Sequence, residues 1–444
     1  MTRSAQRTGL DPRALGELAT QRLGSCEKAL PDAAAGLTVA DFLATAPRLS
    51  AFLTPLLVLD DAALVANTDQ LAGWCAEQGV DLAPHGKTTM APALWERQLQ
   101  AGAWGITVAT PSQLRVAVEF GTPRVLLANA LVDPVALTWL ARTRDADPGL
   151  DVVVWADSVE TVAAMDAVLA PLSPHRPLDV VVELGAAGGR TGARTQEAAE
   201  AVAAAVTASP WVRLRGVGGY EGSLAHDASG TGLAAVRGYL ADVAALHRRL
   251  VAAGAYAEAG EALVTAGGSA YFDDVVDALG PLADPGGASG LPTRVLLRSG
   301  AYLVHDDGFY RGISPFSRSG GSPFTSAMHA WARVVSCPEP GLALLDAGKR
   351  DVPFDEGLPE PQLVADALGA PARPLTGAHV SAVNDQHAFL RTDPASAEQV
   401  RVGQVVRLGL SHPCTAFDKW RWIPVIADRG EADPVVVDLV RTLF

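Results

Sequence analysis

Two segments of this chain carry residue types that could act together on an amine or a carbonyl compound. In the segment Ala83–Thr89, Lys87 follows an apolar run almost directly and His85 lies two residues before it. Desolvation of a lysine at the end of a buried strand favours the neutral amine, which can attack an aldehyde and form a Schiff base. A surface-loop lysine is the alternative interpretation of this position.

The second segment is a glycine-rich turn, Gly267-Gly268-Ser269, between the apolar run Leu263–Ala266 and a helical stretch. Small residues let backbone N–H groups and a hydroxyl approach an anion, which makes this turn a candidate phosphate site. Tyr220 and Arg190 stand near the ends of two other apolar runs and could face a flat anionic ligand, although structural or surface roles are the alternative. A Schiff-base lysine together with a phosphate-binding turn indicates pyridoxal 5′-phosphate (PLP).

A third motif lies far along the chain, in the stretch Gly409–Trp420. His412 and Cys414 are two residues apart, so on an extended chain both side chains lie on the same side. An imidazole and a thiolate can supply two ligands to a divalent metal, with zinc favoured and manganese or magnesium as alternatives. A packed histidine beside a cysteine is the other interpretation.

The composition is that of an ordinary globular protein: 444 residues, 49% hydrophobic and 19% charged. At roughly 150 residues per domain, this length predicts two or three domains, or one large barrel with an appendage. The net charge of −14 disfavours nucleic acid and anionic membrane surfaces as partners. Four scattered cysteines, and the lack of a signal peptide or a long apolar run, predict a cytoplasmic protein.

From about Leu53, short β-branched runs alternate with alanine-rich helical stretches, which is typical of βα units around a parallel sheet. The eight expected strands are Pro55–Asp60, Val80–His85, Gly105–Thr110, Arg124–Asn129, Leu150–Asp157, Leu178–Gly185, Val212–Glu221 and Glu261–Gly268. Eight units match a (β/α)8 TIM-type barrel better than an open doubly wound sheet. The turn after the first strand contains no glycine, which argues against a dinucleotide site there.

After about Val295 the helical stretches become rare, and short alternating segments stand among Gly and Pro residues. We therefore expect a barrel followed by a mostly β C-terminal domain. The predicted division is a helical extension at residues 1–50, a PLP-binding barrel at 51–300, and a β domain with the metal motif at 301–444. In such a barrel the active site lies at the C-terminal ends of the strands, where Lys87 and the glycine turn are expected.

Three motifs in this order resemble the D-serine dehydratase and D-threonine aldolase family of PLP enzymes, which have an alanine-racemase-like (fold type III) barrel followed by a β domain. The motifs are Pro84–Thr88, Thr265–Ser269 and His412–Cys414, and the resemblance covers about Phe52 to Trp422. Two features depart from the family. The chain is longer at its N-terminus, and Asn384–His387 replaces the expected Glu-Glu-His or Gln-Glu-His.

The resemblance implies a role for each candidate residue. Lys87 would hold the cofactor and remove the α-proton of the substrate, and His387, which aligns with the family's histidine, would join it in catalysis. His85, Arg190 and Tyr220 would lie around the cofactor ring. The remaining positions are Gly267, Gly268 and Ser269 for the phosphate, and His412 and Cys414 for a divalent metal that grips the substrate.

The implied activity is that of a lyase, a dehydratase or deaminase of β-hydroxy D-amino acids such as D-serine or D-threonine, giving a 2-oxo acid and ammonia. Aldolase-like members tend to have Asp where Cys414 stands, so the thiol favours elimination. The alternatives are a D-3-hydroxyamino-acid aldolase, an amino-acid racemase and a non-catalytic PLP-binding protein. Relatives on this barrel are commonly dimers, so a homodimer is expected.

Overall fold

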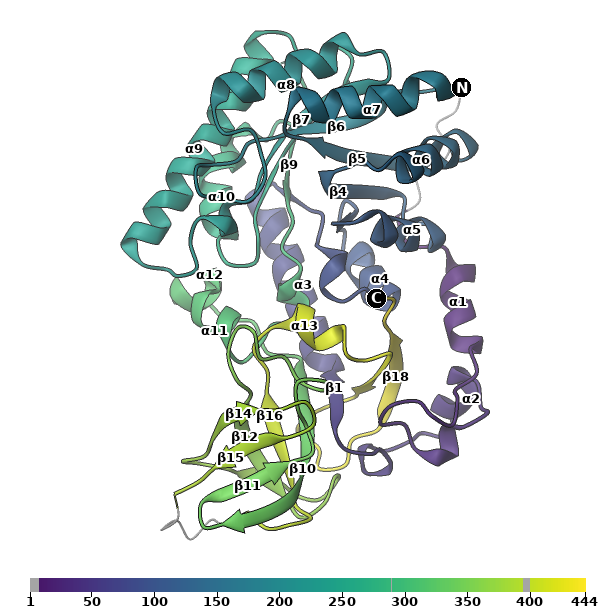
Figure 1. Ribbon diagram of the computed structural model, residues 1–444, viewed down its shortest axis with the longest axis vertical. Coiled ribbons are helices and arrows are strands. Elements are labelled where there is room, and N and C mark those ends of the chain that lie inside the picture. The colour runs from purple at the N-terminus through teal and green to yellow at the C-terminus, as the bar shows by residue number, and fades with distance from the viewer. Residues whose placement is uncertain (1–7, 289, 394–399) are drawn as a thin grey trace. The chain divides into compact units, whose positions relative to one another are not determined.

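The computed structural model describes residues 8–288, 290–393 and 400–444 of the chain (Figure 1). It divides into two compact units, each made from several separate stretches of sequence. Among the described residues, the first unit comprises 8–11, 71–87, 95–288 and 290–300, and the second comprises 12–70, 88–94, 301–393 and 400–444. Each unit has its own sheet and its own candidate residues.

The first unit contains an eight-stranded parallel sheet with the order β2-β9-β8-β7-β6-β5-β4-β3. Its strands are β2 (Asp81–Leu82), β3 (Ile106–Val108), β4 (Arg124–Ala130), β5 (Asp151–Ala156), β6 (Leu178–Glu183), β7 (Val212–Gly218), β8 (Ala262–Ala266) and β9 (Thr293–Leu297). A parallel bridge between His85 and Thr107 joins the chain just after β2 to β3. The two edges of the sheet therefore meet, which confirms the predicted barrel class.

One predicted barrel strand is wrong. The run at 55–60 forms β1 (Leu56–Asp60), which pairs antiparallel with β10 (Met328–Glu339) in the sheet of the second unit. The eighth barrel strand is instead β9, in the region where the helical rhythm of the sequence had ended. β1 is buried along its whole length and is followed directly by a helix, so it has the local pattern of a barrel strand. Only its long-range partners distinguish the two sheets.

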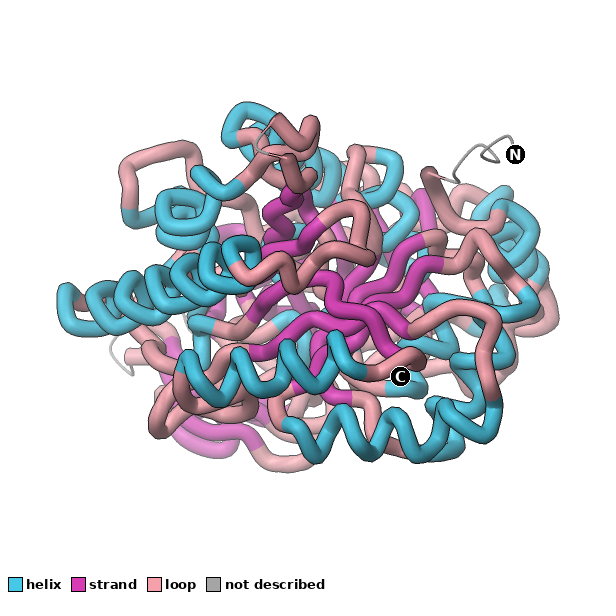
Figure 2. The backbone as a smooth tube through the Cα atoms, turned by 90° about the horizontal axis from the view of Figure 1, so that it is seen from above, coloured by secondary structure: helices cyan, strands magenta, loops and turns pink. Residues whose placement is uncertain are grey.

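Helices alternate with the barrel strands, and in Figure 2 they lie around the strands. They are α5 (Pro111–Glu119), α6 (Pro134–Ala146), α7 (Val159–Leu172), α8 (Gln196–Ala208), α9 (Gly230–Ala252) and α10 (Phe272–Leu279), while α3 (Asp61–Gln78) and α4 (Pro92–Gln100) contain residues of both units. The helices α5 to α9 each begin on a side chain that accepts a backbone N–H of the first turn. Short polar residues in the sequence therefore mark where these helices start.

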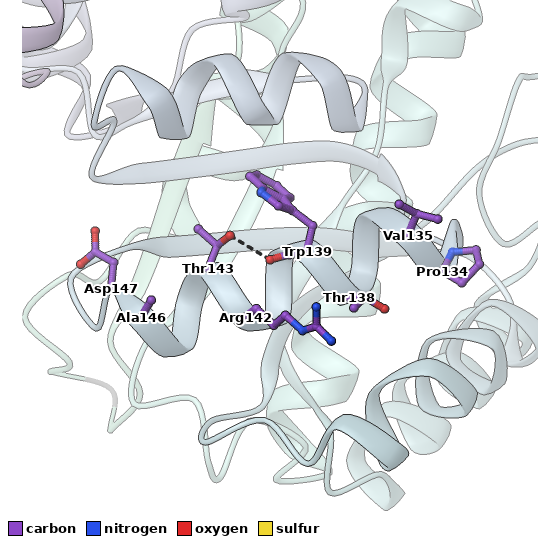
Figure 3. Close-up of a pocket in the computed structure, with 8 residues that line it drawn as sticks. All are labelled: Pro134, Val135, Thr138, Trp139, Arg142, Thr143, Ala146 and Asp147. Atoms are coloured by element: carbon purple, nitrogen blue, oxygen red, sulfur yellow. Dashed lines mark hydrogen bonds between the residues drawn. The ribbon is translucent and has the colours of Figure 1, made fainter.

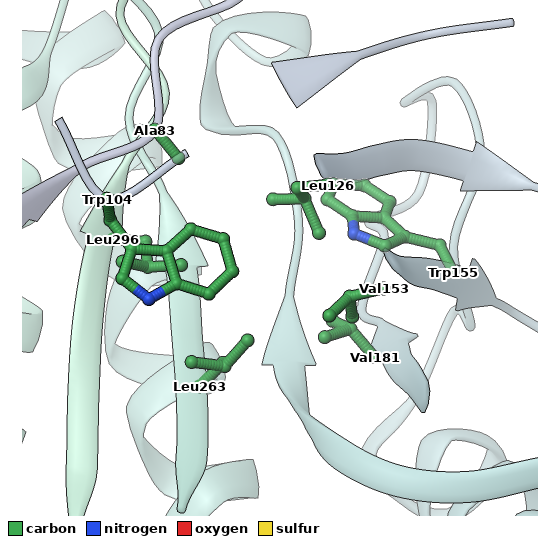
Figure 4. Close-up of a cluster of buried hydrophobic side chains, with 8 residues drawn as sticks. All are labelled: Ala83, Trp104, Leu126, Val153, Trp155, Val181, Leu263 and Leu296. Atoms are coloured by element: carbon green, nitrogen blue, oxygen red, sulfur yellow. The ribbon is translucent and has the colours of Figure 1, made fainter. Parts of the chain in front are cut away.

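The barrel interior is filled by apolar side chains from its strands and the segments beside them (Figure 4). The cluster consists of Ala83, Trp104, Leu126, Val153, Trp155, Val181, Leu263 and Leu296. At the N-terminal ends of the strands, ion pairs link Arg294 to Asp81 and to Glu261, and Arg213 to Asp179. Apolar packing thus stabilises the interior of the barrel, and ion pairs stabilise the N-terminal ends of its strands. The C-terminal ends of the strands are where active sites lie in such barrels.

The second unit is mostly β, as predicted. Its further strands are β11 (Leu342–Leu345), β12 (Glu360–Ala365), β13 (Arg373–Pro374), β14 (His379–Val383), β15 (Ala388–Arg391), β16 (Val405–Gly409), β17 (Trp422–Ile426) and β18 (Val436–Arg441). The main path of the sheet runs β13-β12-β16-β10-β1-β17-β18. Short helices complete the unit: α1 (Pro12–Thr20), α2 (Val39–Ala44), α11 (Phe309–Ile313), α12 (Pro315–Arg318) and α13 (Pro413–Phe417). No helix among the described residues is long and apolar enough to cross a membrane.

Candidate active site

Lys87 lies in a short 3₁₀ turn, Gly86–Thr88, just beyond the end of β2. Close packing fixes this turn, because a Cβ atom at Gly86 would lie 2.7 Å from Ile106 and 2.8 Å from the ring of Trp95. Trp95 also donates its ring N–H to the Gly86 carbonyl at 3.1 Å. The backbone that carries Lys87 is therefore held rigidly at the C-terminal rim of the barrel, where the sequence placed it.

His85, two residues earlier, is held between strands. Its backbone N–H donates to the Arg298 carbonyl at 3.2 Å, and its Nδ1 atom is buried without a hydrogen-bond partner among the described residues. Burial lowers the pKa of His85 well below its ordinary value, and the positive charges of Lys87, Arg298 and Arg190 lower it further. His85 is therefore a neutral imidazole surrounded by cations.

Arg298 is a buried cation that the sequence analysis missed. It follows β9 and donates to Thr265 Oγ1 at 2.7 Å and to the Gly219 carbonyl at 2.6 Å. Its guanidinium lies over the ring of Trp155, 4.9 Å from the centroid, and its Nε atom is buried without a partner among the described residues. The barrel core thus positions a cation at the rim. The sequence analysis did not predict Arg298 as a site residue because it did not recognise β9, the strand that precedes it.

Tyr220 and Arg190, which were predicted from separate loops, lie together. The Arg190 guanidinium is 5.1 Å from the centroid of the Tyr220 ring, within the range of a cation–π contact. Both line a small pocket with Glu183, and burial is the main cause that raises the pKa of that carboxyl. This pair supplies a ring and a cation beside the ends of β6 and β7.

The glycine turn after β8 has the backbone shape that an anion site needs. Gly267 has φ +99°, a conformation that favours glycine, and a Cβ atom at Gly268 would lie 2.9 Å from the Tyr220 ring. The N–H groups of Gly267 and Gly268 point at a carboxylate, that of Glu221, at 3.0 and 2.6 Å. Glu221 was not predicted, although it follows Tyr220 directly in the sequence.

The charged and polar side chains at the rim of the barrel suit PLP. The rim provides three cations, Lys87, Arg190 and Arg298, and the neutral ring of His85. Two buried atoms there, His85 Nδ1 and Arg298 Nε, lack partners among the described residues. Such buried atoms are costly unless a ligand or water satisfies them. The residues present therefore suit an anionic, ring-shaped ligand with an aldehyde.

A second constellation lies in the second unit, at the start of α13. The Nδ1 atom of His412 is 2.6 Å from Asp355 Oδ2, and Thr415 donates to the other Asp355 oxygen at 2.7 Å. Burial lowers the pKa of His412, but hydrogen bonds and charges from Cys414 and Asp355 outweigh it and bring the pKa to about 9. The thiol of Cys414 also lies 3.6 Å from the hydroxyl of Thr88, the residue after Lys87 in the chain.

This arrangement brings together the predicted metal pair and adds an acid that the sequence analysis missed. Metal-binding histidines commonly present one ring nitrogen to the ion and donate the other N–H to a carboxylate, as His412 can do with Asp355. His387 lies elsewhere, exposed in the turn between β14 and β15. Among the described residues, no three His, Cys, Asp or Glu side chains gather as a complete metal site. The two predicted ligands therefore fit only an open site, in which water or substrate would complete the coordination.

The surface along α6 forms a further hollow, but it lacks such chemistry (Figure 3). Its lining consists of Pro134, Val135, Thr138, Trp139, Arg142, Thr143, Ala146 and Asp147, all from α6 or the residue after it. Neither a buried titratable side chain nor a glycine turn is among these residues. The rim of the barrel therefore remains the candidate active site.

Comparisons with known proteins show which proteins this chain resembles. Residues 59–270 match the N-terminal domain of alanine racemase, and residues 327–426 match a serine dehydratase domain. A D-threonine aldolase of Arthrobacter sp. is 28% identical over 379 residues, which cover 84% of this chain and 89% of that protein. A 3-hydroxy-D-aspartate aldolase of Paracoccus denitrificans is 27% identical over 312 residues, covering 69% of this chain and 74% of that protein.

Solved structures show the same fold. A D-threonine aldolase from Filomicrobium marinum superposes with a TM-score of 0.71 at 23% identity and covers 89% of this chain and 96% of its own. A D-threo-3-hydroxyaspartate dehydratase from Delftia sp. gives a TM-score of 0.68 at 22% identity, and the match covers 89% of this chain and 99% of the dehydratase. A cysteine-to-alanine mutant of D-threo-3-hydroxyaspartate dehydratase, described as the metal-free form, gives 0.69 at 21% identity, covering 89% and 99%.

Proposed function

Because this chain belongs to the family of D-serine dehydratases and D-threonine aldolases, we propose that it is a PLP-dependent lyase of β-hydroxy D-amino acids that releases a 2-oxo acid and ammonia. The observation that carries the proposal is the position of Lys87. It lies on a rigid turn at the barrel rim, on the same unit as His85, Arg298 and the glycine turn. A substrate of this class is a small D-amino acid with a hydroxyl on its β-carbon.

When bound, PLP supplies an electron sink for negative charge at the substrate's α-carbon. The Lys87 amine would hold the cofactor and then accept the α-proton. Arg190 and Tyr220 would lie beside the cofactor ring, and the turn Gly267–Ser269 would hold the phosphate. His85, kept neutral by burial and by its cationic neighbours, would offer a nitrogen to the ligand without adding charge.

We further propose that His412 and Cys414 hold a divalent metal, with zinc favoured over manganese and magnesium. A metal supplies Lewis acidity, which would help the β-hydroxyl to leave without a strong protein acid. The metal-free form of a D-threo-3-hydroxyaspartate dehydratase in which a cysteine is replaced by alanine supports this proposal. We also propose that His387, in the turn between β14 and β15, assists catalysis.

The nearest alternative is cleavage of the Cα–Cβ bond by an aldolase, and the names of the two curated relatives favour it. Cys414 favours elimination, since aldolase-like members tend to have Asp at this position. Product analysis decides between the two reactions on a panel of D- and L-amino acids with and without added metal. A 2-oxo acid with ammonia supports the proposal, whereas glycine with an aldehyde assigns the aldolase.

The same panel covers the remaining alternatives. Inverted substrate without other products would indicate a racemase, and a bound chromophore without turnover would indicate a PLP-binding protein. Lys87→Ala should abolish both the yellow chromophore and activity. Borohydride reduction followed by peptide mapping should place the pyridoxyl group on Lys87, and a label on any other lysine would overturn the assignment.

A further inference from the structure

The buried carboxylate of Glu221 occupies the N–H groups that the glycine turn offers to an anion. Glu221 has 0% of its surface exposed. Its Oε2 accepts from the Gly267 N–H at 3.0 Å, and its Oε1 accepts from the Gly268 N–H at 2.6 Å. Two successive N–H groups aimed at one carboxylate form an anion-binding concavity. In this protein the chain itself fills that concavity.

Contacts on the other sides hold the same turn. The Tyr220 ring covers Gly268, where a Cβ atom would lie 2.9 Å from the ring. Ser299 donates to the Gly268 carbonyl at 3.1 Å, and the backbone N–H of Arg298 donates to the Gly267 carbonyl at 3.1 Å. The turn after β8 is therefore tied to the segments after β7 and β9, and Glu221 supplies the central link.

Glu221 has two conceivable relationships to a cofactor phosphate. It could occupy the place of the phosphate and leave when PLP binds, or it could stay and shape the turn. Both of its oxygens accept charge-assisted hydrogen bonds, and displacement would break both of them. The Gly267 N–H is itself buried, so a phosphate there would also have to enter a site closed to solvent. These observations favour a carboxylate that stays in place.

We propose that Glu221 is a positioning residue that holds the Gly267–Gly268 turn in the shape required for PLP, and that the phosphate contacts lie beyond these two N–H groups. The inference rests on the proposed function, since it concerns the cofactor of that site. It changes the role of Gly267 and Gly268: they shape the turn and bind an internal anion, and the phosphate is bound by other groups of the rim.

The test compares two ligands that differ only in the phosphate. Glu221→Gln keeps the size of the side chain but replaces one acceptor oxygen with a donor, so one glycine N–H loses its acceptor. Cofactor-free protein is titrated with PLP and, separately, with pyridoxal, and binding is followed by visible absorbance. We expect the affinity for PLP to fall by about tenfold or more and the affinity for pyridoxal to stay the same.

Asp179→Asn is the matched control. Asp179 is also buried and accepts two hydrogen bonds, from Arg213 at 2.6 and 3.0 Å, but it lies near the N-terminal end of β6, away from the rim. Thermal unfolding of both variants measures the loss of stability, and only Glu221→Gln should change the ratio of PLP to pyridoxal affinity.

Each other outcome has a defined meaning. Tighter PLP binding by Glu221→Gln would show that the carboxylate competes with the phosphate, and an unchanged ratio of affinities would reduce Glu221 to a structural role. Either result would overturn the inference while the proposed function stands. Failure of the unmodified protein to bind either ligand at Lys87 would overturn the proposed function and the inference with it.

Discussion

Replacement of Asp355 by asparagine tests whether His412 is prepared to bind a metal ion. A carboxylate 2.6 Å from Nδ1 of His412 keeps a proton on that nitrogen, so Nε2 is the nitrogen that gives up its proton to bind a metal. Asparagine carries an NH₂ group, which can donate to Nδ1 and favour the tautomer whose Nε2 holds the proton. Metal binding must then first reverse this tautomer.

The expected magnitude follows from the single hydrogen bond that changes. Loss of a carboxylate partner behind a metal-binding histidine typically weakens metal binding roughly 10- to 100-fold. This corresponds to about 1.4–2.7 kcal/mol of binding free energy. Thr415 donates to the other Asp355 oxygen, so Thr415→Val leaves the contact with His412 intact and should weaken binding less.

Calorimetric titration of metal-free protein with zinc, in the presence of a competing chelator, measures these affinities. The order of affinities should be the unmodified protein, then Thr415→Val, then Asp355→Asn. Equal affinities for the unmodified protein and Asp355→Asn would refute the role of Asp355. Absence of stoichiometric zinc binding by the unmodified protein would refute the metal site itself.

Three further predictions concern stability. Burial raises the pKa of Asp306 to about 7, so the stability that this carboxyl contributes is complete below its ordinary pKa of 3.8 and falls by up to about 4 kcal/mol as the pH rises to about 7. Asp306→Asn should flatten this part of the profile of thermal midpoint against pH, and an unchanged slope would contradict the assignment. Leu263→Ala in the barrel core should cost about 2–5 kcal/mol in chemical unfolding, and a cost under about 1 kcal/mol would show that the cavity collapses. Lys28 and the buried Asp351 form an ion pair at 2.8 Å, so Lys28→Met should lower the free energy of unfolding by about 2 kcal/mol. If the pair is the cause, this loss should largely vanish in an Asp351→Asn background.

The Lys28 contact also shows what the region before residue 51 does, which the sequence did not indicate. Besides its ion pair with Asp351, Lys28 lies 3.7 Å from the centroid of the Trp420 ring and donates to the Arg350 carbonyl at 2.9 Å. Gln386 donates to the same Asp351 carboxylate at 3.2 Å. Lys28 thus anchors the N-terminal extension to two segments of the chain. One lies before the predicted catalytic His387, and the other lies after the predicted metal ligand His412.

Local sequence determined much of this protein. The spacing of apolar runs, the polar residues that cap helices and the glycines that end them act over a few residues, so strands, helices and the strand-end positions of Lys87 and Tyr220 could be predicted. The chemistry of a lysine, a glycine turn and a histidine–cysteine pair is equally local. These features do not depend on which strand lies beside which.

Only the tertiary structure decided the rest. Whether β1 or β9 completes the barrel depends on pairing between residues hundreds of positions apart, of β1 with β10 and of β9 with β2, because both runs are almost entirely buried. The contacts of Glu221 with the glycine turn and of Asp355 with His412 likewise join segments 46 and 57 residues apart. Such contacts form only when a long stretch of chain closes into a loop, and residue type and short-range spacing carry no record of where that closure occurs.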